Sequence, residues 1–94
     1  ADVIIINMDS NYTKEYLKLA RLLRENNIKT DFFTDNKKMD KQLKYADRKG
    51  LRFAITNASN EFDKNVIKLK DLKKSSYIED NLENIIRYIN QELK

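Results

Sequence analysis

The chain has 94 residues, of which 40% are apolar and 36% are charged, and its formal net charge is +4. This length fits one domain with a single core, and no apolar run approaches the ~20 residues that are needed to cross a bilayer. Because cysteine and histidine are both absent, disulfides, Cys/His zinc sites and a serine–histidine relay are excluded. The first residue is alanine, so we expect residues 1–94 to be a single domain cut from a longer protein.

The first half of the chain alternates predicted strands and helices. Residues 3–6 are an unbroken run of valine and isoleucine, which is typical of a strand that is covered on both faces. A predicted helix begins at Ser10 or Asn11 and ends at residues 26–27, with apolar side chains at helical spacing. The aromatic and β-branched run 29–34 predicts a second strand.

A second helix is predicted between a cap at residues 35–36 and Gly50, the only glycine of the chain. Its buried stripe consists of Met39, Leu43 and Ala46, which recur at helical spacing. Glycine commonly ends a helix in the left-handed region, so Gly50 has a sufficient structural explanation.

The second half of the chain predicts further strands. Residues 51–56 are typical of a buried third strand, and residues 57–65 of a polar loop. In residues 66–72, apolar and lysine side chains alternate, which indicates a half-exposed strand. Tyr77 and Ile78 are predicted to add a short edge strand.

A final helix is predicted from Asp80 and Glu83, which have the spacing of a capping box. Its buried side is formed by Leu82, Ile85, Ile86, Ile89 and Leu93. Alternating strands and helices at the start imply parallel pairing, and the closely spaced later strands imply an antiparallel element. We therefore predict an α/β domain with three α/β/α layers, a mixed sheet of about five strands, and three helices.

Motifs for catalysis and for nucleotide binding are absent from the sequence. One glycine cannot supply a G-x-G-x-x-G turn or a phosphate-binding P-loop. Asp9 and Asp35 could contribute to a Mg²⁺ site, but cap and loop roles explain both residues better. The serines lack a base that would activate them. We therefore predict no catalytic residue, no metal site and no cofactor in this domain.

Positive charge is concentrated in residues 37–52, which carry seven cationic and two acidic side chains, a net charge of +5. Such a local excess attracts polyanions through counterion release, although charge alone favours an ordinary solvated helix face. Gln42 and Tyr45 lie among the lysines and offer a base-edge hydrogen-bonding group and a stacking face. Each also has a structural explanation, Gln42 as a helix surface residue and Tyr45 as cover for the helix–sheet seam.

Residues 39–55 (MDKQLKYADRKGLRFAI) and 60–72 (NEFDKNVIKLKDL) resemble the C-terminal anticodon-binding domain of histidyl-tRNA synthetases. The matching positions are Lys41 to Asp47, Gly50, Glu61, and Lys70 to Leu72. The segments ADVIIIN and LKLARLLRENNIKTDFF also fit the family's first strand, helix and second strand. The resemblance therefore covers nearly the whole chain.

The resemblance implies a mixed five-stranded sheet wrapped by three helices and appended to the catalytic domain of a homodimeric, cytoplasmic class II enzyme. It also implies that the domain holds the anticodon stem-loop of histidine tRNA. Aminoacylation with ATP and Mg²⁺ would then take place in the catalytic domain of the same chain. The resemblance implies no membrane contact.

Phosphate contacts position an RNA on a protein, and base contacts read its sequence. The resemblance suggests which residues make each kind of contact. Lysines around the second helix are expected to attract phosphates, and polar side chains near strand ends are expected to meet base edges. The expected RNA-binding residues are Lys37, Lys38, Lys41, Gln42, Lys44, Tyr45, Asn57, Glu61, Lys68 and Lys70. Asn7, Met8 and Asp9 are expected to line the same surface.

Three sites depart from the family's pattern, one of them being residues 73–76, which are shorter than the family's usual excursion there. Ala58 and Ser59 replace a glycine–glutamate pair after the third strand, and Asn65 replaces a later turn glycine, whose conformation asparagine can adopt. The change at Ala58 and Ser59 removes a flexible hinge and a carboxylate beside the expected reading loop. The alternative is therefore a related module for protein–protein interaction, dimerisation or tRNA sensing without aminoacylation.

Overall fold

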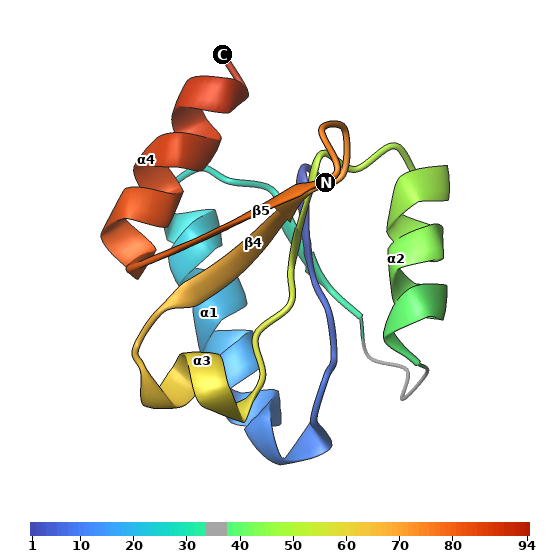
Figure 1. Cartoon of the computed structure of the whole chain (residues 1–94). Helices are drawn as coiled ribbons and strands as arrows, with labels where there is room; N and C mark the ends of the chain where they lie inside the picture. Colours follow the sequence, from blue (N-terminus) through green and yellow to red (C-terminus); the bar gives the residue numbers. More distant parts are fainter. Residues whose placement is uncertain (34–37) are drawn as a thin grey trace.

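The computed structural model describes residues 1–33 and 38–94, and its centre is a five-stranded sheet with the strand order β2-β1-β3-β4-β5 (Figure 1). The strands are β1 (Val3–Ile5), β2 (Thr30–Phe32), β3 (Phe53–Ile55), β4 (Ile67–Asp71) and β5 (Ser76–Asp80). β1 pairs in parallel with β2 and β3, whereas β4 is antiparallel to both β3 and β5. The predicted mixed sheet is confirmed.

Helices cover both faces of this sheet. In the described residues they are α1 (Thr13–Glu25), α2 (Met39–Arg48), α3 (Ser59–Asp63) and α4 (Leu82–Glu92), with a 3-10 turn, η1 (Ser10–Tyr12), before α1. Figure 1 shows α1 and α4 on one side of the sheet and α2 on the other. The predicted three layers are confirmed, with α3 as a short helix that the sequence did not indicate.

The hydrophobic core has one part on each face of the sheet. The larger part contains Val3, Ile5, Phe53, Ile55 and Leu69, packed against Tyr16, Leu23, Ile85 and Ile89 of the helices. The smaller part contains Ile4, Ile6 and Ala54, packed against Ala46 of α2. Alternate residues of β1 therefore enter opposite parts of the core, which confirms that this strand is covered on both faces.

The helix boundaries in the first half differ from the predicted ones by a few residues. The predicted helix at Ser10 or Asn11 begins instead as η1, which Asp9 caps by accepting a hydrogen bond of 2.9 Å from the Asn11 N–H. The predicted end of the second strand at Thr34 and the predicted cap at residues 35–36 lie outside the described residues.

Two predictions for the second half were wrong, and a third, the edge strand at Tyr77 and Ile78, is confirmed with a greater length. The polar segment 57–65 contains α3, which lacks apolar periodicity because Phe62 is its main contact with the core. The last edge strand spans all of β5, because each of its residues pairs with β4. Asn81, and not Asp80, caps α4, since its Oδ1 accepts a 2.9 Å hydrogen bond from Asn84 N–H.

Gly50 lies just beyond α2 with φ at 72°, in the left-handed region that was predicted for it. Replacing Gly50 with alanine should lower the free energy of unfolding by about 1 kcal/mol, because a Cβ atom disfavours this conformation. A Cβ atom would meet no other atom within 4 Å, so no clash adds to the loss. Gly50→Asn should lower the free energy of unfolding by less, because asparagine tolerates the left-handed region better than alanine. Urea unfolding of the two variants measures the difference, and equal decreases would contradict this explanation.

Candidate nucleic-acid interface

The exposed lysines that were predicted to meet phosphate are on α2 and at its N-terminus. Lys38, Lys41 and Lys44 are exposed, and so is Tyr45, of which 36% is accessible. Lys37 lies outside the described residues. The sheet-facing side of α2 carries Met39, Leu43 and Ala46, as the spacing predicted.

α2 presents two different flanks beside its buried stripe. Lys38, Lys41, Tyr45 and Lys49 follow one another at three- or four-residue steps and therefore share one flank, which we call the cationic flank. This flank lies toward the β2 side of the sheet, because the Tyr45 ring packs edge-on against Phe33 with centroids 5.3 Å apart. Lys49 Nζ lies 5.7 Å from the centre of the same Tyr45 ring.

The opposite flank of α2 faces β4 and has a mixed charge. Asp47 lines a shallow hollow with Leu72 and Lys73 at the end of β4, which identifies this flank. Asp40, Lys44 and Asp47 lie along it at steps of four and three residues. Lys44 therefore has Asp40 and Asp47 as well as Lys41 and Arg48 at helical spacing, whereas Lys41 has Lys38, Lys44 and Tyr45 and no carboxylate at that spacing. The structure thus separates two lysines that the sequence treated alike.

A second surface with exposed cations, which also carries Glu79 opposite Lys68, lies on the part of the sheet that α2 leaves open. Lys68 and Lys70 alternate with core residues of β4 and so point to the face of the sheet that carries α2. Tyr77 of β5 is directly opposite Lys70 in the pairing and is 45% exposed. Lys68 Nζ and Lys70 Nζ lie 5.0 Å and 5.4 Å from the Tyr77 ring centre. We call Lys68, Lys70 and Tyr77 the open sheet face.

Sequence reasoning placed Tyr77 on an edge strand but did not assign it a role. The useful signal was present, because the alternation in residues 66–72 already turned Lys68 and Lys70 outward. Finding the tyrosine beside them required the register of β4 against β5, which local sequence does not specify.

Gln42 was predicted to meet base edges, and this prediction was wrong. Its side chain is fully buried. The carboxamide Oε1 accepts a 2.8 Å hydrogen bond from Asn7 N–H, and Nε2 donates a 2.9 Å bond to the Asn7 carbonyl oxygen. Position 42 falls at helical spacing with Met39 and Ala46, so the buried stripe includes it despite its polarity.

Asn57 was also predicted to meet base edges, and it too is fully buried. Its Nδ2 donates to the Val66 carbonyl oxygen at 2.9 Å, and its Oδ1 accepts from Lys68 N–H at 2.7 Å. The Asn57 carbonyl oxygen accepts a 2.7 Å bond from the Tyr16 hydroxyl. Asn57 therefore joins the end of β3 to β4 and α1, which excludes it as a contact for RNA.

The other predicted residues near the strand ends differ in exposure. Asn7 is buried, Asp9 is half-buried as the cap of η1, and Met8 is 38% exposed. Glu61 is half-buried, and its Oε1 accepts a 2.7 Å hydrogen bond from Ala58 N–H at the start of α3. Of the segment 7–9, only Met8 is well exposed in this structure, so the expectation for Asn7 was wrong.

Burial raises the pKa of the Tyr16 phenol above its ordinary value, with a smaller upward effect from the charges of Asp9 and Glu61. Main-chain hydrogen bonds from Met8 and Asp9 oppose this change. Tyr16 is therefore a neutral hydrogen-bond donor at physiological pH, and it ties the segments after β1 and β3 to α1.

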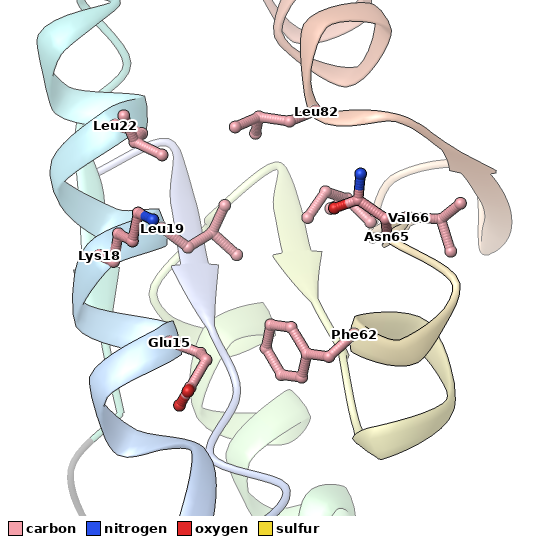
Figure 2. Close-up of a pocket in the computed structure, with 9 residues that line it drawn as sticks. Glu15, Lys18, Leu19, Leu22, Phe62, Asn65, Val66 and Leu82 are labelled. Carbon is pink, nitrogen blue, oxygen red and sulfur yellow. The ribbon is translucent and has the colours of Figure 1, made fainter.

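A groove of about 260 Å³ lies on the opposite side of the sheet, between α1, the α3–β4 connection and the start of α4 (Figure 2). Leu19, Leu22, Phe62, Val66 and Leu82 supply its apolar lining, and Glu15 and Lys18 lie at one side. None of the predicted RNA-binding residues lines it.

Residues 1–33 and 38–94 contain no group of three or more acidic side chains arranged to hold a metal ion. No helix in these residues is long and apolar enough to span a bilayer.

The family profile described as "Anticodon binding domain" matches residues 2–92. The chain belongs to this family. A histidine–tRNA ligase of Pelagibacter ubique is 45% identical over 71 residues, which make up 74% of this anticodon-binding domain and 15% of that protein. A histidine–tRNA ligase of Caldicellulosiruptor bescii is 32% identical and matches 98% of the domain and 22% of its own length.

The fold of this anticodon-binding domain agrees with a solved structure. The crystal structure of histidyl-tRNA synthetase from Nostoc sp. PCC 7120 matches the whole domain with a TM-score of 0.96 and 26% sequence identity, over 23% of that chain. The resemblance that the sequence indicated is confirmed. The domain spans less than a quarter of the length of each of these relatives.

Proposed function

We propose that this anticodon-binding domain binds the anticodon stem-loop of histidine tRNA as one domain of a histidine–tRNA ligase. The family match over residues 2–92 carries the proposal, and the similarity to histidine–tRNA ligases supports the choice of tRNA. The exposed lysines of these two surfaces supply the electrostatic attraction that RNA binding needs.

The cationic flank suits the sugar–phosphate backbone. Lys38, Lys41 and Lys49 are exposed ammonium groups on one side of a rigid helix, and they have no carboxylate at three- or four-residue spacing among them on that flank. Such groups attract phosphates without regard to base sequence. In this proposal Tyr45 contributes a stacking face at the same flank, and Lys44 contributes less because Asp40 and Asp47 offset its charge.

The open sheet face suits unpaired bases. An exposed aromatic ring flanked by cations on a sheet is a common platform for single-stranded RNA, whose splayed bases stack on the ring. Tyr77 provides that ring, and Lys68 and Lys70 approach it from β4. Glu61 keeps one carboxylate oxygen beyond the bond to Ala58 that could accept from a base amino group.

We further propose that aminoacylation takes place elsewhere in the longer protein. The domain covers less than a quarter of its relatives, so the proposal assigns ATP, Mg²⁺ and the reacting groups to a catalytic domain of the same chain. It also includes a homodimeric parent enzyme in the cytoplasm. The comparisons offer no support for the alternative of a protein–protein module, and α3 accommodates the departure at Ala58 and Ser59.

The matched pair Lys41→Glu and Lys44→Glu tests RNA binding by this domain. Lys41→Glu should weaken binding of the anticodon stem-loop and lower the slope of log K against log salt by about one for each lost phosphate contact. Lys44→Glu should have a smaller effect, because Asp40 and Asp47 already offset part of the charge of Lys44. Fluorescence titrations at several salt concentrations measure both. If the wild-type domain does not bind the stem-loop at low ionic strength, the proposed function is refuted.

A further inference from the structure

α2 is attached to the sheet by a small apolar surface. Within the described helix α2, Ala46 is the only apolar residue that is fully buried, and Met39 and Leu43 are half-buried. Gln42 is the other fully buried residue of this helix. A helix that carries the proposed phosphate contacts is therefore attached by a thin apolar stripe and one buried carboxamide.

The carboxamide of Gln42 matches the main chain of Asn7 in both directions. It accepts from Asn7 N–H at 2.8 Å and donates to Asn7 C=O at 2.9 Å, as a neighbouring strand would in a ladder. Asn7 comes just after β1, the central parallel strand, where the regular pairing ends. Burying an unpaired peptide group is unfavourable, so this pairing matters for the position of the β1 end.

Asn7 leads directly into Met8 and Asp9, and a comparable arrangement holds the neighbouring strand end. There, the Tyr16 hydroxyl and the side chain of Asn57 fix the segment after β3. Helices on the two faces of the sheet therefore each hold one strand end by a buried polar side chain. Gln42 is the member of this arrangement that connects to the basic helix.

We propose that Gln42 is a positioning residue for RNA binding, which holds the cationic flank of α2 in a fixed place relative to the end of β1. This inference rests on the proposed function. Gln42 touches no RNA itself. Its pairing with Asn7 orders α2 before RNA arrives, so that the lysines bind without first losing conformational freedom.

The test compares Gln42→Met, which keeps the side-chain volume and removes both hydrogen bonds to Asn7, with Gln91→Met on the exposed surface of α4. In Gln42→Met, the Asn7 amide should exchange with solvent about tenfold faster or more. Affinity for the anticodon stem-loop should fall about tenfold. The slope of log K against log salt should stay unchanged, because every lysine is retained. Gln91→Met should match the wild type in all three measurements.

Gln42→Glu provides a second variant in case Gln42→Met does not fold. It keeps the volume and the acceptor for Asn7 N–H but loses the donor to the carbonyl oxygen when ionised. A folded variant with a freely exchanging Asn7 amide and wild-type affinity would overturn the inference, because Gln42 would then serve stability alone. A reduced salt slope would also overturn it, since it would indicate a lost phosphate contact. If the wild type and Gln91→Met fail to bind as well, the proposed function fails and this inference falls with it.

Discussion

Replacing Asp71 with alanine is expected to lower the free energy of unfolding by about 3 kcal/mol. The Asp71 side chain is 4% exposed and pairs with Arg52 through two hydrogen bonds of 3.0 Å and 2.9 Å. Its Oδ1 also accepts from the N–H groups of Lys73 and Lys74 at the β4–β5 turn. Alanine would leave the guanidinium of Arg52 without its main partner and the turn without its cap.

Arg52 also links this pair to the last helix. Its Nη2 donates a 2.9 Å hydrogen bond to Glu92 of α4, which also accepts a 3.0 Å bond from Lys74 Nζ. Asp71 therefore supports the contact between β4 and α4 as well as its own turn. Urea unfolding at neutral pH measures the loss, and Asp63→Ala at the exposed end of α3 is the control, for which we expect little change.

The stabilisation by Asp71 should depend on pH in a defined direction. The hydrogen bond from Arg52 is the main cause that lowers the pKa of Asp71 in the folded protein, and the Lys74 and Lys73 N–H groups add to it, against an opposing effect of burial. Because the pKa of Asp71 is lower in the folded protein, the ionised carboxylate stabilises the fold at pH values above its unfolded pKa of about 4. This stabilisation is lost as the pH falls through the folded pKa. The difference between wild type and Asp71→Ala should therefore be largest near neutrality and shrink in acid. A pH-independent difference would contradict this explanation.

Replacing Tyr77 with alanine is expected to weaken binding of the anticodon stem-loop by about 1–2 kcal/mol, or roughly tenfold, if one base stacks on this ring. Stability should change little, because Tyr77 is 45% exposed on the edge strand β5. Tyr77→Phe should keep most of the affinity, because the phenyl ring preserves the stacking face. Titration of the three proteins with the same stem-loop measures the effect.

Tyr45→Ala is the matched comparison, because Tyr45 is the exposed tyrosine on the cationic flank of α2. We expect it to weaken binding less than Tyr77→Ala, since the Tyr45 ring is already packed against Phe33. A larger effect at Tyr45 would place the bases on that flank. Wild-type affinity in both variants would contradict the proposal that RNA bases stack on these two tyrosine rings.

Local sequence was sufficient for much of the fold because the signals were strong and short in range. The run 3–6 allowed no exposed face for β1, and the structure buries every residue in it. Gly50 marked a helix end that needs a positive φ. The prediction for residues 57–65 was wrong because the local signal there is weak. The five mostly polar residues of α3 provide no periodicity that distinguishes a helix from a loop.

The exposure expected for the predicted site residues was only partly right, because a sequence does not reveal whether a polar side chain faces water or the interior. Lys38, Lys41 and Lys44 are exposed as expected, since burying an ammonium group without a partner is very unfavourable. Gln42 and Asn57 are neutral, and both the oxygen and the nitrogen of each carboxamide bond to main-chain groups. Both are buried for that reason.

The sequence by itself determined the layered α/β architecture, the family, and a helix with concentrated positive charge, because periodicity and motif spacing are properties of neighbouring residues. Tertiary structure decided which charges lie together. The distance between Lys44 and Lys41 along α2 is short, yet packing against β2 and β4 gives them different surroundings. The tertiary structure also places Tyr77 beside Lys68 and Lys70. It brings Gln42 into contact with Asn7, which is 35 residues away in the chain. Such contacts depend on strand register and helix docking, which only the assembled core imposes.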